Sequence, residues 1–491
     1  MTSYGRRRFL AVAGSLTVGG GAVATGCTRS SSRRAEPGHF RWWHHFEPLR
    51  EVNEEVGGAF EDAHEGVAVE ATVYNPADLG QALQLAHRTG QMPDIHTVAD
   101  LGLAEQALYE QGWITPLRLT DEQRARIDDS TLVEGLHLFD GALYSFPLFT
   151  FRQHATLTWF NRELVERAGG DPRHGPATWD EFRAVARRIT ANGDGDEYGW
   201  IQGLTFVDRL ETHLIELAQA AGAVMSHTSA SPPPPGLADP RTGDYVFDSD
   251  PFVDALEFLG SLVADGVVHP ASTSLDAQTS RARWATGVGG FFFDGPWNVG
   301  VVLEQFGPFA DRMGVADVPS PEGGATLYKG PAGGQFWLSG QCRQPELVSR
   351  LIGELASTEY ARAVAECQDQ PPLNDAVVAE ADVHPTYRRA VELFRGIRLA
   401  PTPVGRNPAV GSVISAMQDV RPTLGEIVQG YLGGDVDDAR AALRTFNGAL
   451  EAERERAIRQ VNGEGLAVAA DDWVFHDFEP GQDYGTERYP R

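Results

Sequence analysis

The stretch GGFFFDGPWNVG, residues 289–300, decides the fold. Its three consecutive phenylalanines indicate a short strand in a sheet that is buried on both faces. The run stops at Asp294, and the Gly-Pro pair that follows predicts a tight turn into a helix, with Pro296 in its first turn. Trp297 is therefore expected at the carboxyl end of a buried strand, beside unpaired helix N–H groups. This is the usual position of a ligand in an open α/β sheet.

The chain around this stretch is long and acidic. Its 491 residues exceed the size of one ordinary core, so two or more lobes are expected. The 68 acidic and 41 basic residues give a formal net charge of -27, and no run of arginines forms the basic surface that a phosphate backbone requires. Nucleic-acid binding is therefore not expected. Lys329 is the only lysine, and we interpret the preference for arginine as coding bias or salt adaptation.

The first 27 residues resemble an export signal, which is excluded from the fold. RRRFLAVAGSLTVGGGAVATGC, residues 6–27, begins with an arginine cluster similar to the twin-arginine motif and ends in a sequence that resembles a lipobox. In such signals the cysteine, here Cys27, receives diacylglycerol and becomes the mature N-terminus. Residues 28–38 then read as a polar tether. A plain transmembrane anchor is the alternative, which the high glycine content disfavours.

Two further cysteines lie in the body of the chain. Cys342 and Cys367 are either a disulfide, worth roughly 3 to 4 kcal/mol if the geometry allows it, or two unpaired buried thiols. The sequence leaves both alternatives open.

No metal or cofactor is expected. Neither body cysteine belongs to a CxxC motif or has a histidine at ligand spacing. His44, His45 and Glu47 do not have the spacing of most zinc sites, and the NGDGD stretch at residues 192–196 lacks the acidic residue that a calcium loop needs at its twelfth position.

Strands alternate with helices in the first part of the mature chain. HFRWWHHF (39–46), GVAVEATVY (66–74) and MPDIHTVA (92–99) are predicted as strands, separated by amphipathic helical patterns. Because side chains alternate along a strand, only one of Trp42 and Trp43 is expected to point into the core. This rhythm predicts a parallel sheet with helices on its faces.

The chain is predicted to pass into a second lobe near residue 150. Residues 141–161 are rich in aromatic residues and threonine and contain a proline, so they favour a long edge or crossing strand. A helix is expected from Asn161, and Thr178 with Glu181 predicts a capping box at the start of another. The C-terminal tail has too few apolar residues for its own core. Its aromatic residues are expected to pack back onto a lobe.

Several motifs occur in a distinctive order. They are the lipobox, the aromatic first strand, GQMPDI, GWITPL, YSFPL with LTWFNRELVERAG, ATWDEF, GGFFFDGPWNVG, and PSPEGG followed by GGQFWLSG. Each alone is a weak signal. The ordered series resembles the maltose-binding-protein-like carbohydrate group (family 1) of extracellular solute-binding proteins, the capture components of ABC importers, over nearly all of residues 40–450.

The resemblance implies a periplasmic-binding-protein-like α/β fold of type II, in which crossing hinge strands join two α/β lobes with a ligand cleft between them. The implied N-terminal lobe comprises residues 39–152 and 312–357, and the C-terminal lobe residues 153–311 and 358–491. The implied function is that of a lipid-anchored receptor without enzymatic activity. It would bind a sugar or oligosaccharide at the outer face of the cell membrane and deliver it to the ABC permease subunits, as a monomer without a cofactor.

Trp297 is the first candidate ligand contact, because the tryptophan of this motif stacks on sugar in the family. An indole covers the apolar C–H face of a sugar, while Asp294 and nearby N–H groups would bind its hydroxyls. The alternative is that the ring only plugs the lobe surface. The other candidates lie at implied cleft positions, and for each the alternative is core packing, helix capping or ion pairing: Trp43, His44, Glu47, Asp100, Arg152, Gln153, Gln335 and Trp337.

Two rival functions remain at this stage. A secreted carbohydrate-active enzyme would need two carboxylates ~5 to 9.5 Å apart, and the sequence shows no marked pair. A lipoprotein that binds no sugar would have no small-molecule cleft. The residues 402–417, where family members often carry another aromatic side chain, contain none, which leaves the length of the ligand open.

Overall fold

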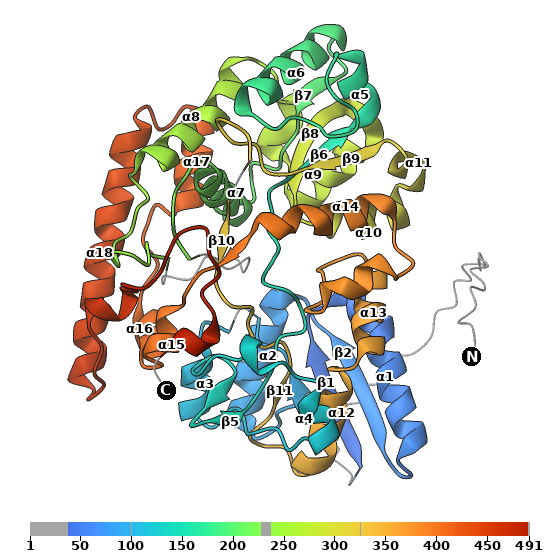
Figure 1. The fold of residues 1–491 in the computed structure, drawn as a ribbon, viewed down its shortest axis with the longest axis vertical. Coiled ribbons are helices and arrows are strands. Elements are labelled where there is room, and N and C mark those ends of the chain that lie inside the picture. Colours follow the sequence, from blue (N-terminus) through green and yellow to red (C-terminus); the bar gives the residue numbers. More distant parts are fainter. Residues whose placement is uncertain (1–37, 100, 227–236, 325, 490–491) are drawn as a thin grey trace, which may run out of the picture. The chain divides into compact units, whose positions relative to one another are not determined.

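The computed structural model describes residues 38–99, 101–226, 237–324 and 326–489 (Figure 1). Three predictions fall outside these residues. They are the export signal with Cys27, most of the tether, and the candidate ligand contact Asp100.

The N-terminal lobe is built on a four-stranded sheet in the order β11-β3-β1-β2. The first strand pairs in parallel with β2 and β3, and β11 runs antiparallel to β3. Burial alternates along the first strand, so Trp42 lies in the core while Trp43 is only half-buried, as the alternation predicts. The strands are β1 (His39–His44), β2 (Ala68–Val73), β3 (Ile95–His96) and β11 (Trp337–Leu338).

The C-terminal lobe is built on a second four-stranded sheet in the order β7-β8-β6-β9. All six residues of β8 are buried, and Phe291 and Phe293 pack against Phe182 of a covering helix. The prediction of a strand buried on both faces is confirmed. The strands are β6 (Leu157–Asn161), β7 (Tyr198–Trp200), β8 (Gly289–Asp294) and β9 (Met313–Ala316).

The boundary predicted at residue 312 lies too early. Strand β9 pairs antiparallel with β6, so residues 313–316 belong to the C-terminal sheet. The chain returns to the N-terminal lobe only after β10 (Tyr328–Lys329), which pairs with β12 (Arg398–Leu399) in a separate two-stranded sheet.

The segment predicted as one long strand at residues 141–161 is interrupted. It contains β5 (Ala142–Leu143), then an irregular stretch, and then β6. The helix predicted from Asn161 and the capping box of Thr178 and Glu181 are both present. Three segments cross between the lobes: the irregular stretch before β6, the region around β10, and the residues after α13 (Thr358–Glu366).

Helices flank both sheets and continue to the C-terminus. The long α18 packs against α8, α16 and α17 (Figure 1). The N-terminal lobe carries α1 (Arg50–Ala63), α2 (Pro76–Thr89), α3 (Glu105–Glu110), α4 (Asp121–Ala125) and α12 (Pro345–Glu354). The later part carries α5 (Arg162–Arg167), α6 (Trp179–Asn192), α7 (Val207–Ala220), α8 (Asp250–Ala264), α9 (Ala277–Arg283), α10 (Asn298–Gln305), α11 (Gly307–Ala310), α14 (Pro385–Leu393), α15 (Pro403–Arg406), α16 (Val410–Ala416), α17 (Leu424–Gly433) and α18 (Ala439–Gly463).

The C-terminal tail packs back as predicted. Trp473, Phe475 and Phe478 are all buried. The last two belong to a hydrophobic cluster that also contains Val133 of the N-terminal lobe and Tyr328 of β10.

Of the two alternatives for the body cysteines, the structure has the second, because Cys342 and Cys367 are both free thiols. Each is half-buried against the core of the N-terminal lobe, where burial raises the pKa of both thiols to about 12. They therefore pack as small apolar side chains. Within the described ranges, no helix is long and apolar enough to cross a membrane.

Candidate functional site

The turn after β8 folds the indole of Trp297 back over Gly295. A β-carbon at Gly295 would lie 2.2 Å from the ring, so only glycine allows this approach. The helix predicted from Pro296 begins at Asn298, with Trp297 as its N-cap residue. The indole N–H donates a hydrogen bond of 2.7 Å to the carboxylate of Asp294, which fixes the ring at the carboxyl end of the strand.

Asp294 is buried, with 2% of its surface exposed, and its carboxylate is already satisfied. One oxygen accepts from Trp297 and from the backbone N–H of Gly295. The other is paired with the guanidinium of Arg281, at 2.6 Å and 2.8 Å. Asp294 was a candidate acceptor for ligand hydroxyls, but its contacts here orient Trp297.

The ring of Trp297 also makes a cation–π contact with an arginine. The guanidinium of Arg209, on α7, lies over the indole at 4.7 Å from the ring centroid. Burial lowers the pKa of Arg209, and the nearby carboxylate of Asp294 opposes this effect. Among the described residues, the side chain of Arg209 has no hydrogen-bond or ion-pair partner. It is therefore a donor with free hydrogen-bonding capacity beside the predicted stacking residue.

At the N-terminal lobe the strand ends present His45 rather than His44. His44 is fully buried and contacts Asn53, whereas His45 follows β1 and its ring nitrogen lies 2.8 Å from the hydroxyl of Thr97. Burial lowers the pKa of His45 to about 4, so its imidazole is neutral at pH 7. His45 therefore offers an uncharged polar side chain at the end of β1.

A cavity of about 290 Å³ lies where the strand ends meet the crossing segments. Gln153, a predicted contact, is 5% exposed and donates to Gln370, while its amide oxygen has no partner among the described residues. Gln335, also predicted, already binds Leu148 and Gly333 through both ends of its amide. The lining residues are His45, Phe46, Val98, Phe149, Thr150, Phe151, Gln153, residues 329–335 and Gln370.

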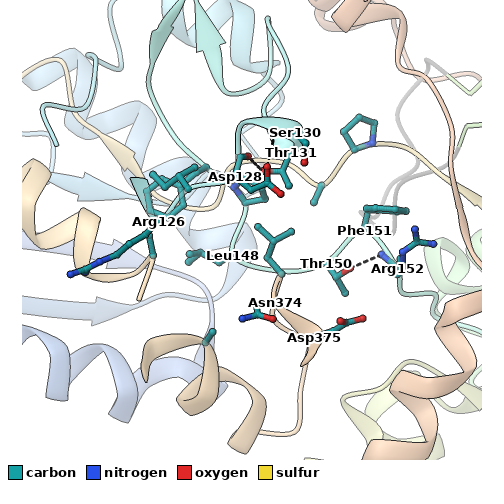
Figure 2. Close-up of a pocket in the computed structure, with 18 of the residues that line it drawn as sticks. Arg126, Asp128, Ser130, Thr131, Leu148, Thr150, Phe151, Arg152, Asn374 and Asp375 are labelled. Carbon is teal, nitrogen blue, oxygen red and sulfur yellow. Dashed lines mark hydrogen bonds between the residues drawn. The ribbon is translucent and has the colours of Figure 1, made fainter. Parts of the chain in front are cut away.

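A second cavity of about 850 Å³ lies beside the same crossing segment. Figure 2 shows Leu148 and Thr150 between the loop of residues 126–131 and Asn374. Arg152, a predicted ligand contact, lines this cavity and pairs with Asp483 of the C-terminal tail at 2.5 Å. We assign the ligand to the smaller cavity because it lies at the carboxyl ends of β1 and β3, where open α/β sheets bind ligands.

Of the predicted contacts that the structure describes, Gln153 and Gln335 line the smaller cavity. The others do not line it: Trp43, His44, Glu47, Arg152, Asp294, Trp297 and Trp337. Trp43 packs against Tyr74 with the ring centroids 5.0 Å apart and the rings tilted by 49°, and the exposed Glu47 pairs with Arg50. Trp337 is 0% exposed in a hydrophobic cluster of the N-terminal lobe. Trp337 is therefore a core residue, which was the alternative to a ligand contact.

No pattern in the sequence indicated Arg209 or Gln370, since their positions depend on contacts between distant segments. His45 had such a pattern in the alternation of β1, whose even-numbered residues point into the core. Within the described ranges, no group of three His, Cys, Asp or Glu side chains has the geometry of a metal site.

Comparison with known proteins agrees with this architecture. The chain is similar to the cyclic alpha-maltosyl-1,6-maltose binding protein of Arthrobacter globiformis, with a TM-score of 0.61, 17% identity, and coverage of 85% of this chain and 99% of that one. The sugar-binding protein MalE of Xanthomonas citri gives a TM-score of 0.59 at 18% identity. The match covers 87% of this chain and 100% of that one. At these identities the likeness concerns the fold.

Sequence relatives are binding proteins as well. A binding protein of Brucella abortus (strain 2308) is 26% identical over 278 residues, which cover 55% of this chain and 60% of the relative. The match thus spans about three fifths of that relative's length. The sn-glycerol-3-phosphate-binding periplasmic protein UgpB of the same strain is 21% identical over 418 residues. The match covers 82% of this chain and 90% of the relative. The family model for bacterial extracellular solute-binding proteins matches residues 47–362, and the chain belongs to this family of binding proteins.

Proposed function

We propose that the protein is a lipid-anchored extracellular receptor that binds a sugar or a related polyol and delivers it to the permease of an ABC importer. The observation that carries the proposal is the cavity of about 290 Å³ at the strand ends. Its volume suits a small ligand, and the crossing segments that line it would transmit ligand binding to lobe closure.

The lining of this cavity matches the two kinds of surface on a sugar. Phe46, Phe149 and Phe151 supply aromatic surface for C–H groups. The neutral His45 and the amide of Gln153 supply hydrogen bonds, and the free oxygen of Gln153 would accept from a hydroxyl.

The ligands named for similar proteins support the same class. The structural neighbours include proteins named for maltose derivatives and for chitin oligosaccharide, and relatives include proteins named for sn-glycerol-3-phosphate. All of these ligands carry several hydroxyl groups. A polyhydroxylated ligand for this chain is consistent with the structural neighbours and with the sequence relatives.

A thermal-shift screen of residues 38–491 against mono- and oligosaccharides tests the ligand. A compound that binds only the native state raises the melting temperature. We expect a rise with at least one uncharged sugar, and chromatography should recover that sugar unchanged. Consumption of the sugar would contradict a receptor. The absence of any rise across sugars, polyols and their phosphates would contradict the ligand class.

Membrane anchoring is tested separately on the full chain. Export followed by metabolic labelling with a fatty acid should label the wild type, and Cys27→Ser should abolish the label and release the protein into the medium. The variant Cys342→Ser is the matched control, since that thiol is half-buried in the N-terminal lobe. Continued labelling of the Cys27 variant would contradict the anchor.

A further inference from the structure

The first half of the C-terminal tail, residues 464–489, is fixed to the C-terminal lobe. The backbone N–H of Phe475 donates to the carbonyl of Pro240 at 2.6 Å. The guanidinium of Arg454, on α18, lies over the ring of Trp473 at 5.3 Å from the ring centroid. Both aromatic side chains are buried. This half of the tail therefore moves with the C-terminal lobe.

The second half of the tail is bonded to two of the segments that cross between the lobes. The carboxylate of Asp483 pairs with Arg152 of the first crossing segment at 2.5 Å, and it accepts from the backbone N–H of Leu399 at 2.8 Å. Leu399 lies in β12, which pairs with β10 of the second crossing segment. The N–H of Gly481 donates to the hydroxyl of Tyr328 in β10 at 3.0 Å. The tail thus ties the two crossing segments together.

The same half of the tail reaches the N-terminal lobe. The hydroxyl of Thr486 donates to the carbonyl of Ser130 at 3.1 Å. Tyr484 and Tyr489 belong to the hydrophobic cluster that contains Val133. The tail is therefore a connection between the lobes in addition to the three crossing segments.

The two cavities lie on opposite sides of the crossing segments. Four residues line both cavities and so form a wall between them: Thr150, Phe151, Pro331 and Ala332. Figure 2 shows Thr150 and Phe151 on the side of the larger cavity. Asp483, Thr486 and Ser130 line the larger cavity and not the smaller one. The contacts of the tail thus lie on the side of the crossing segments away from the cavity assigned to the ligand.

Closure of the lobes would strain these contacts. Of the described residues that line the smaller cavity, none belongs to 155–311, so the body of the C-terminal lobe must move toward a ligand to enclose it. A rotation about the crossing segments that narrows one side widens the other. It would pull Thr486, which is tied to the C-terminal lobe through the tail, away from Ser130.

We infer that the tail is a brace that holds the lobes apart in the absence of ligand and thereby lowers the affinity for sugar. Interactions that favour the unliganded arrangement reduce the apparent affinity, because a ligand that closes the lobes must also break them. Weaker retention favours release of the ligand to the permease. This inference rests on the proposed function, since it assumes that a bound ligand closes the lobes.

The test compares wild type with Asp483→Asn, Thr486→Val and the double variant by titration calorimetry. The probes are maltose, glucose and the sugar that gives the largest rise in the thermal-shift screen. Asparagine keeps an acceptor for Leu399 but loses the charge that holds Arg152, and valine keeps the shape of threonine without its hydroxyl. We expect the double variant to bind the sugar at least about threefold more tightly than wild type, with the single variants between them.

The matched controls are Asp471→Asn and Thr445→Val. Asp471 pairs with Arg406 of α15 at 3.0 Å, so its substitution removes the same kind of ion pair from the tail without touching a crossing segment. The hydroxyl of Thr445, on α18, donates to the carbonyl of Ala441 within the same helix at 2.9 Å. Both controls should retain wild-type affinity.

A second readout uses the protein without ligand. Small-angle X-ray scattering should give a smaller radius of gyration for the double variant than for wild type, because the lobes are freer to close. A tail that only stabilises the fold would give a lower melting temperature with unchanged or weaker binding, which would overturn the inference. An unchanged radius would also overturn it and leave a sugar receptor in place. If the wild type binds no sugar, the proposed function fails, and the scattering comparison still decides whether the brace exists.

Discussion

Trp297 lies so close to Gly295 that a β-carbon on the glycine would sit 2.2 Å from the indole ring. Trp297→Ala should weaken sugar binding at least tenfold, with the fold intact, because the stacking surface is lost. Gly295→Ala should weaken binding similarly by displacing the ring, and should lower stability by about 1 to 3 kcal/mol through overpacking. Calorimetry and urea unfolding measure the two effects.

The matched control for this pair is Gly448→Ala. Gly448 lies within α18 and has no atom within 4 Å of its β-carbon position, so alanine should preserve affinity and slightly raise stability. Wild-type affinity in Trp297→Ala would remove this residue from the site.

The pair of Lys329 with Glu216 should be important for stability. The two side chains are 1% and 0% exposed, and Glu216 also accepts hydrogen bonds from Ala155 and Thr156 in a crossing segment. Lys329→Met should lower the free energy of unfolding by about 3 to 5 kcal/mol, because it leaves a buried carboxylate without its cation.

The double variant Lys329→Met with Glu216→Gln tests this explanation. It should recover part of the loss in urea denaturation, since no buried charge of the pair remains unpaired. If the double variant loses the sum of both single effects, the interaction between the two charges is not the cause.

Acidification should lower the stability of the fold already at pH values above those at which most carboxylates titrate. Burial lowers the pKa values of five histidines to about 4 or about 3, from an unfolded value near 6.5. Their contribution is fully present above the unfolded pKa and is lost as the pH falls, at about 1.4 kcal/mol per pH unit for each. The histidines are His44, His45, His96, His137 and His213.

Three carboxyls oppose this trend. Burial raises the pKa of Glu211 to about 7 and that of Asp369 to about 6, and it also raises the pKa of Glu105, so all three stabilise the fold as the pH falls. Because the histidines outnumber them, urea midpoints of the ligand-free protein should fall from pH 7 to pH 4.5. His174→Gln, at an exposed position, should leave the slope unchanged. A midpoint that rises on acidification would contradict the burial of the histidines.

The free thiols give a direct chemical test. Denatured, unreduced protein without residues 1–37 should contain two thiols by colorimetric titration, those of Cys342 and Cys367. The native protein should react slowly, because burial keeps both thiols protonated at pH 8. A count of zero would show a disulfide.

Local patterns predicted much of the fold because their causes are local. The phenylalanine run identified β8, alternation distinguished Trp42 from Trp43, and the spacing of Thr178 and Glu181 marked the start of α6. The predicted extent of the crossing strand was wrong, because its residues satisfy their backbone groups through contacts with other crossing segments rather than a regular ladder.

The site was predicted less completely because it is assembled from distant segments. Arg209 of α7 lies over the ring of Trp297, which is bonded to Asp294 after β8, and no spacing in the sequence predicts that contact. Trp337 was misleading for the opposite reason: a tryptophan beside a double glycine suits both a cleft and a core, and the packing around β11 determines which. The pairing of Cys342 and Cys367 stayed open because spacing in sequence carries no information about whether two sulfur atoms meet.

The burial of Lys329 makes amine chemistry a reporter of unfolding. No other lysine exists in the chain, and this one is 1% exposed. Amine-acylating reagents should therefore leave the ε-amine of the folded protein unmodified and label it only when the region around β10 opens. Mass spectrometry of a single peptide would then measure the opening rate, with and without sugar, in a protein whose surface offers arginine as its basic side chain.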